Sequence, residues 1–104
     1  MTIKLRIAAK PYFWHDEALD GATYRFQYKY NTLTEKFYVN ITGLNNDVSI
    51  DGTAVLPGMD MIKFNGYGGQ LGELWLIDNA SPDAPENPTF DEFGTRWTLE
   101  YTPK

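Results

Sequence analysis

Strict alternation of aromatic and polar residues in the stretch 24–42 constrains this chain more than any other feature. The stretch reads YRFQYKYNTLTEKFYVNIT, and every second residue of 24–30 is aromatic. Successive side chains of a strand point to opposite faces, so this period of two predicts a half-buried β-strand. Residues 37–41 repeat the period, and the polar segment 31–34 between them predicts the turn of a β-hairpin.

A lone hairpin is marginally stable in water, so further strands must cover its aromatic face. Five other segments carry apolar or alternating patterns that predict strands: 2–9, 48–56, 59–64, 73–78 and 96–102. Six to seven short strands with turn signals between them indicate an all-β fold, either a small antiparallel β-barrel or a sandwich. The side chains expected mainly inside are Tyr24, Phe26, Tyr28, Phe37, Val39, Ile41, Leu74, Leu76, Trp97 and Leu99.

Three segments are predicted to connect these strands as loops. Residues 11–21, PYFWHDEALDG, begin with a proline and are the least strand-like part of the first half; 16–19 could form one helical turn. The rings at positions 12–14 either fold back as a lid over the open end of the core or form an exposed anchor for a partner. The other two loops are the glycine-rich segment 65–72 and the proline-containing segment 79–94.

Composition limits the classes of function. The 104 residues suffice for one domain, 1–104, and a content of 42% hydrophobic and 22% charged residues is typical of a globular chain. Without cysteine there is no disulfide and no thiolate metal site. The formal charge of −5 disfavours binding to nucleic acid. No stretch is long enough to span a membrane, and the N-terminus does not resemble a secretory signal.

No catalytic constellation is found. His15 is the only histidine, and the neighbouring Asp16 and Glu17 are weak evidence for a general base because neighbours in an extended chain point apart. The glycines of 65–72 do not have the spacing or the following helix of a dinucleotide site, and no Lys-Ser or Lys-Thr makes a P-loop. We therefore predict no enzyme, no cofactor and no metal. A carbohydrate-binding module with exposed rings and a structural building block both remain open.

Several short motifs follow one another along the chain: Tyr30-Asn31, Val39-Asn40-Ile41, Leu56-Pro57-Gly58, Met61-Ile62, Gly72-Glu73-Leu74 with Asp78, and Pro88, Asp91, Gly94 and Arg96 before Leu99 and Tyr101. In this order and spacing they resemble the small baseplate plug family of contractile-tailed bacteriophages. The similarity covers about residues 22–101, and 1–21 lie outside it. Phe37, Leu33 and Phe93 depart from the family pattern.

The resemblance implies a non-enzymatic virion protein of the tail baseplate, assembled in the host cytoplasm. It implies partners among tube, hub or wedge components and a role in holding neighbouring tail subunits together. Contacts with several neighbours at once favour loops, which lie outside the scaffold. We therefore expect 10–21, 65–72 and 79–94, and not the hairpin face, to bind partners. The candidate partner-binding residues are Tyr12, Phe13, Trp14, Tyr67, Asp83, Glu86 and Asp91.

Overall fold

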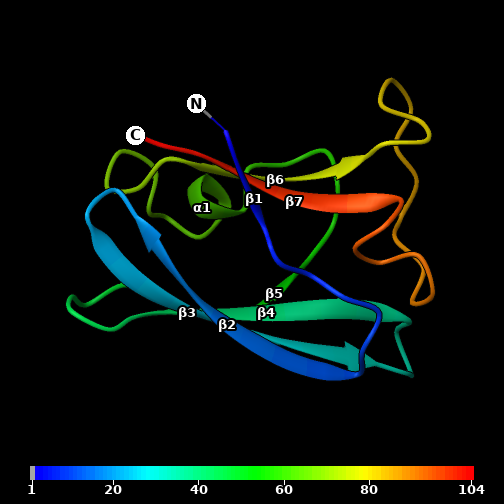
Figure 1. The fold of residues 1–104 in the computed structure, drawn as a ribbon, viewed down its shortest axis with the longest axis horizontal. Helices are drawn as coiled ribbons and strands as arrows, with labels where there is room; N and C mark the ends of the chain where they lie inside the picture. The colour runs from blue at the N-terminus through cyan, green and yellow to red at the C-terminus, as the bar shows by residue number, and fades with distance from the viewer. Residues whose placement is uncertain (1) are drawn as a thin grey trace.

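The computed structural model describes residues 2–104 as two antiparallel β-sheets on opposite sides of one core (Figure 1). One sheet has the strand order β1-β7-β6 and the other β2-β3-β4-β5. The elements are β1 (Ile3–Leu5), β2 (Tyr12–Leu19), β3 (Ala22–Asn31), β4 (Lys36–Gly43), β5 (Ser49–Ala54), α1 (Met61–Phe64), β6 (Glu73–Asp78) and β7 (Trp97–Thr102). The prediction of an all-β chain with about seven short antiparallel strands is confirmed, and over residues 2–104 the strands do not close into a barrel.

The predicted hairpin forms the centre of the four-stranded sheet. β3 and β4 pair with Phe26 opposite Ile41 and Tyr28 opposite Val39, so the apolar positions of both strands share one face. The turn is closed by Asn31, whose Oδ1 accepts hydrogen bonds from the backbone N–H groups of residues 33 and 34. The alternating pattern therefore specified both the strands and their register.

The prediction of an irregular connection at 11–21 is wrong, as is that of a helical turn at 16–19. All eight residues of β2 pair with β3, from Tyr12 opposite Lys29 to Leu19 opposite Ala22. Asp20 and Gly21 make the two-residue turn between them, with φ values of 50° and 83°. Two positive φ angles are what a tight hairpin of the favoured hand requires, and Asp-Gly supplies them. The Asp20-Gly21 dipeptide indicates a hairpin turn in the sequence, but the three adjacent rings at 12–14 led to the prediction of a loop.

Two other predicted strands differ from the structure. Residues 59–64 were predicted as a strand, but Met61–Phe64 form the single helical turn α1. Asp60 caps this turn, because its Oδ1 accepts a hydrogen bond from the backbone N–H of Ile62 at 3.0 Å. A short apolar run cannot be assigned to strand or helix by periodicity alone. The first strand is also shorter than predicted, since β1 covers only Ile3–Leu5 of the segment 2–9.

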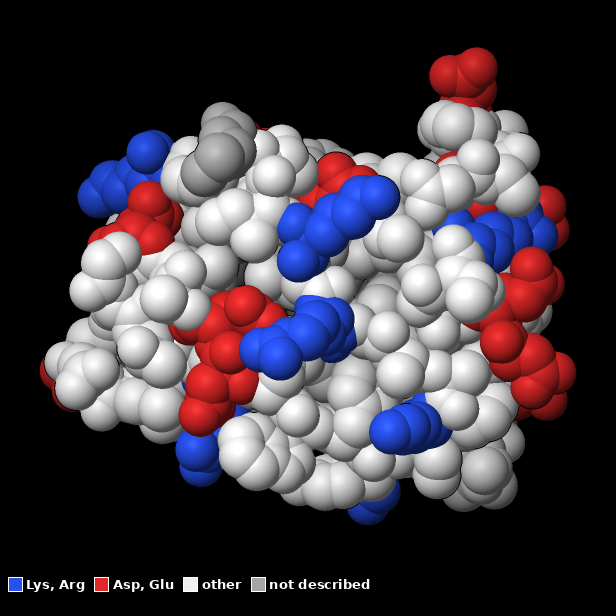
Figure 2. Space-filling model, viewed as in Figure 1, with Lys and Arg blue, Asp and Glu red and all other residues white. Residues whose placement is uncertain are grey.

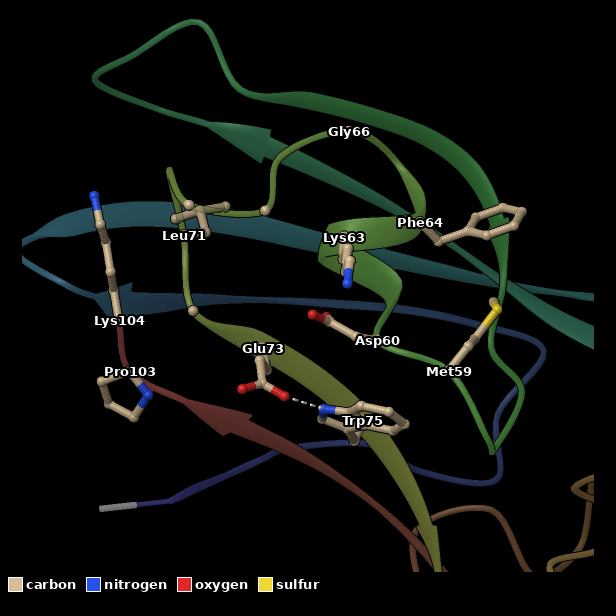
Figure 3. Close-up of a pocket in the computed structure, with 13 residues that line it drawn as sticks. Met59, Asp60, Lys63, Phe64, Gly66, Leu71, Glu73, Trp75, Pro103 and Lys104 are labelled. Atoms are coloured by element: carbon tan, nitrogen blue, oxygen red, sulfur yellow. Dashed lines mark hydrogen bonds between the residues drawn. The ribbon is translucent and has the colours of Figure 1, made fainter.

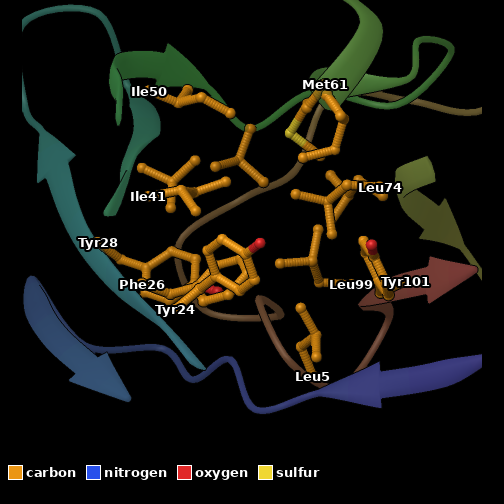
Figure 4. Close-up of a cluster of buried hydrophobic side chains, with 14 of the residues drawn as sticks. Leu5, Tyr24, Phe26, Tyr28, Ile41, Ile50, Met61, Leu74, Leu99 and Tyr101 are labelled. Atoms are coloured by element: carbon orange, nitrogen blue, oxygen red, sulfur yellow. The ribbon is translucent and has the colours of Figure 1, made fainter. Parts of the chain in front are cut away.

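The core lies between the two sheets, and all ten side chains predicted to be inside are buried. In Figure 4, Leu74, Leu99 and Tyr101 from the three-stranded sheet face Phe26 and Ile41 from the four-stranded sheet. Strand β6 has the predicted bounds but is not covered on both sides as expected. Its residues at 74, 76 and 78 are buried, whereas those at 75 and 77 are only half-buried.

We expect Trp97→Ala to unfold the isolated protein or nearly so. Trp97 is fully buried, and truncating a buried aromatic side chain costs about 3–5 kcal/mol, a large share of the roughly 5–15 kcal/mol that stabilises a domain. Urea denaturation followed by circular dichroism measures the loss. Trp14→Ala is the matched control, since this indole is 52% exposed and should lose far less. Equal midpoints for the two variants would contradict the prediction.

Candidate interaction surfaces

The outward face of the four-stranded sheet carries aromatic rings beside polar side chains. Strand register places Tyr12, Lys29 and Tyr38 side by side across β2, β3 and β4. The next row has Trp14, Gln27 and Asn40, again one from each strand. Tyr12 is 57% exposed and Trp14 52%, so both rings project from the scaffold instead of packing into the core. We call the outward side chains of β2–β5 the outer face.

The Trp14 ring is held in place on this face. The Arg25 guanidinium carbon lies 4.6 Å from the centre of the indole ring, which is the geometry of a cation–π contact. Arg25 is itself fixed by Asp16, with its Nε 2.9 Å and its Nη2 3.1 Å from the two carboxylate oxygens. This hydrogen bonding lowers the pKa of Asp16. A ring that is already ordered loses less conformational entropy when a partner covers it.

A hollow of about 580 Å³ lies on the outer face near the tip of the β3–β4 hairpin. Tyr12 and Tyr38 border it, and Lys29 lies between them in the strand register. Leu33, at the hairpin tip, also lines it and is 93% exposed. The remaining lining residues are Gln27, Tyr28, Tyr30, Asn31, Thr32, Asn40 and Gly52.

A second hollow, of about 940 Å³, lies between α1, the start of β6 and residues 103–104 (Figure 3). Phe64, 71% exposed, and Trp75 contribute its large rings. The Trp75 indole donates a hydrogen bond to Glu73 Oε1 at 2.9 Å. The charged side chains that line this hollow have both signs: Asp60 and Glu73 are acidic, and Lys63 and Lys104 are basic. No single ligand charge is therefore favoured here.

The loop 79–94 is anchored at its base by one buried carboxylate. Asp78, 1% exposed, accepts hydrogen bonds from Arg96 Nε at 2.8 Å and Nη2 at 2.9 Å. Arg96 Nη2 also donates to Glu86 Oε2 at 3.0 Å. Acidic side chains gather at this end of the molecule, over the loop (Figure 2). Asp83 and Asp91 are exposed there.

The predicted partner-binding residues do not form one site. Tyr12 and Trp14 lie on the outer face, while Asp83, Glu86 and Asp91 lie on the loop at one end of the molecule. Strand alternation separates the three neighbouring rings, and this could not be predicted while 11–21 was treated as a loop. The exposed rings beside the hairpin were not expected on this face, although Lys29 already stood on the polar side of the alternating pattern.

Two of the predicted residues have contacts within the fold. Phe13 points inward, is half-buried and stacks on Tyr28 with ring centres 4.4 Å apart. The Tyr67 hydroxyl accepts a hydrogen bond from the backbone N–H of Ser49 at 3.2 Å and donates to its carbonyl at 3.1 Å. Tyr67 thus satisfies the outward backbone groups of the edge strand β5. Both side chains support the scaffold.

His15 lies in the core and not at a cleft. Its ring is 8% exposed and stacks against Phe26 and Tyr28, and Nε2 is 2.9 Å from the Tyr28 hydroxyl. Nδ1 lies 2.9 Å from Glu17 Oε2, off the line of a good hydrogen bond. Burial lowers the pKa of His15, and the Glu17 carboxylate partly opposes this shift. Asp16 instead faces Arg25 on the outer face, so the three adjacent residues form no acid–base pair at a surface.

Over residues 2–104 there is no group of three or more His, Asp or Glu side chains placed to hold a metal ion. In the same part of the chain, no helix has both the length and the apolar character that crossing a membrane requires.

Comparison with known proteins gives one family. The family model described as cyanophage baseplate Pam3 plug gp18 matches residues 1–104. The match therefore also includes residues 1–21, which lay outside the similarity noted in the sequence. No curated protein matches the chain.

We expect the Asp78 anchor of the loop to stabilise the protein less in acid than at neutral pH. The Arg96 hydrogen bonds hold the pKa of Asp78 well below its usual value. A carboxylate whose pKa is lower in the folded state stabilises folding above its unfolded pKa of about 3.9, and this contribution is lost as pH falls below it. Urea midpoints measured between about pH 6 and pH 2 should therefore fall in the wild type.

Asp78→Asn provides the comparison, because an amide cannot titrate. It should be less stable than the wild type at pH 6, and the difference should shrink below about pH 4, where Asp78 takes up a proton in the unfolded state and protonation favours unfolding. A stability gap that stayed constant down to pH 2 would show that the Asp78 charge contributes nothing.

Proposed function

The chain belongs to the cyanophage Pam3 baseplate plug gp18 family, and from this premise we propose that it holds neighbouring tail subunits together before contraction. It is thus a structural protein of a phage virion, located in the tail baseplate. The family implies a non-enzymatic role and contact with other baseplate proteins. Contact with tube, hub or wedge components, and assembly in the host cytoplasm, belong to the proposal.

The observation that supports the binding role is the ordered pair of exposed rings, Tyr12 and Trp14. Exposed Tyr and Trp side chains are the residues most often found to dominate binding energy at interfaces. Here they project from a paired strand, and Arg25 already orders the indole ring. A surface that is ordered before docking suits a protein whose task is to keep neighbours in a fixed arrangement.

The contact regions that we propose differ from the three loops expected from the sequence. Because 12–19 is a strand beside the hairpin, its exposed rings share the outer face with hairpin residues such as Lys29 and Tyr38. We therefore propose two contact regions: the outer face, and the loop 79–94 with Asp83, Glu86 and Asp91. Phe13 and Tyr67 act indirectly, by supporting the strands that carry these regions.

The double variant Tyr12→Ala/Trp14→Ala should fold normally yet fail to enter tails. Both rings are more than half exposed, so their truncation removes partner contacts and little core packing. The measurement is complementation of a phage that lacks this protein, followed by immunodetection of the variant in purified tails. Circular dichroism melting of the isolated variant checks that it is folded.

Phe64→Ala is the matched control, because it removes an exposed ring far from the outer face and should be incorporated as the wild type is. Normal incorporation of the Tyr12/Trp14 variant would refute the proposed role of these rings. The same conclusion would follow if Phe64→Ala were lost to the same extent, because no particular surface would then be distinguished.

Carbohydrate binding remains the rival function, since sugar stacking also needs exposed rings. Stacking needs an open ring face, and Arg25 already covers one face of Trp14. We therefore expect no hit on a glycan array and no glycan-dependent quenching of tryptophan fluorescence. Micromolar glycan binding that is abolished by Trp14→Ala would favour carbohydrate binding over the structural role.

A further inference from the structure

The hollow on the outer face is suited to a negatively charged side chain. Lys29 lies in its lining, and none of the residues that line it is Asp or Glu. Lys29 makes no ion pair within residues 2–104, so its charge is not neutralised by the fold. In a chain with a formal charge of −5, a hollow with one cation and no acid is unusual.

Besides the positive charge of Lys29, the polar groups around it also suit a carboxylate. The phenol rings of Tyr12 and Tyr38 flank the lysine in the strand register, and Gln27 and Asn40 lie in the adjacent row. The Asn40 carbonyl oxygen accepts a hydrogen bond from Gly52 N, which leaves its NH₂ group as a donor. The Tyr38 hydroxyl donates to Thr34 Oγ1, and the Tyr12 hydroxyl accepts a hydrogen bond from Gln27 Nε2. The donors left to a ligand in this hollow are therefore the Lys29 ammonium, the Asn40 amide and the Tyr12 hydroxyl.

The same chain carries acids of the matching kind on the loop 79–94. Asp83, Asp91 and Glu92 are exposed and have no ion-pair partner in the described part of the chain. The first part of this loop, drawn in yellow after β6, rises beyond the three-stranded sheet and away from the outer face, whereas the part before β7 returns toward the four-stranded sheet (Figure 1). There Phe90, next to Asp91, packs against Tyr30, which lines the hollow. The first part of the loop, which carries Asp83, therefore does not reach the hollow of its own molecule.

We propose that the hollow on the outer face receives the acidic loop 79–94 of a second copy of this chain. This inference rests on the proposed function and names one of the neighbours that the protein holds. The two surfaces differ, so the contact is head-to-tail, and successive copies form a closed ring or an open row. Opposite charges steer such an encounter and fix its register.

Self-association of the isolated full-length protein tests the proposal. Sedimentation velocity over a wide concentration range should show oligomers that weaken as NaCl is raised from about 50 to 500 mM, since salt screens exposed charges. Lys29→Glu should weaken association by about tenfold or more, because it places like charges together. Lys4→Glu is the matched control: it makes the same charge change on β1, outside the hollow, and should associate as the wild type does.

Charge exchange makes the test specific. Asp83→Lys/Asp91→Lys should weaken association as Lys29→Glu does, and an equimolar mixture of the two variants should associate again, because each hollow then meets a loop of opposite charge. A wild-type protein that stays monomeric at every concentration would overturn the proposal, as would equal behaviour of Lys29→Glu and Lys4→Glu.

If the wild type is monomeric and the Lys29→Glu variant is not incorporated into tails, the hollow does not receive a second copy of this chain. Its occupant is then an acidic neighbour of another kind. The proposed function would survive that result, because its own test is incorporation into tails and not self-association.

Discussion

The buried carboxylate of Asp78 is the interaction on which the second half of the fold depends. Its two oxygens accept hydrogen bonds from the backbone N–H groups of Ala80, Ser81 and Glu86 and from the guanidinium of Arg96. A buried charge is costly unless it is paired and hydrogen-bonded, and here every bond draws on the loop or on the residue that precedes β7. The same group thus ends β6, closes the loop 79–94 and sets the start of β7. Arg96 in turn lies over the ring of Trp97, 4.4 Å from its centre, and so links the anchor to the core.

Small sheets expose many edge groups relative to their size, and single side chains satisfy several of them here. Tyr67 binds both backbone groups of Ser49 on β5, and Asp60 accepts a hydrogen bond from Leu74 N on β6. Arg6 donates to the carbonyl of Asp16 on β2 at 3.3 Å. Edges managed in this way are poor templates for another strand. Partners are therefore expected to bind through a sheet face and a loop, where side chains and not backbone groups are free.

Much of the fold could be predicted from the sequence because alternation is a local signal. The hairpin, β7 and the core residues that they carry followed from the period of two, which assigns each side chain to a face without knowledge of the neighbours. β6 was predicted from a short apolar run, and the expectation that it is covered on both sides was wrong. The failures share one cause: the pattern was short or mixed. In 12–19 the rings stand in adjacent positions, and only the pairing with β3 separates Phe13 from Tyr12 and Trp14. The outer face that we propose as a contact region could not be predicted for the same reason, because Tyr12, Lys29 and Tyr38 become neighbours only when three strands are in register.

The residues that carry the family resemblance mostly build the scaffold. A Cβ on Gly72 would lie 1.9 Å from the carbonyl oxygen of Thr102, and Gly94, with a φ of 98°, passes close to the carbonyl of Ile7. The Tyr101 hydroxyl accepts a hydrogen bond from Gly72 N, and Asp78 binds Arg96. These contacts join β6, β7 and the N-terminal segment, so the motif specifies how the second sheet closes. On the outer face, Trp14 and Lys29 lie outside the motif, whereas Asn40 belongs to it, as does Asp91 on the loop. The motif therefore identifies mainly the fold and contains only a few of the side chains proposed to contact a neighbour, while the exposed ring of Trp14 and the charge of Lys29 are not specified by it.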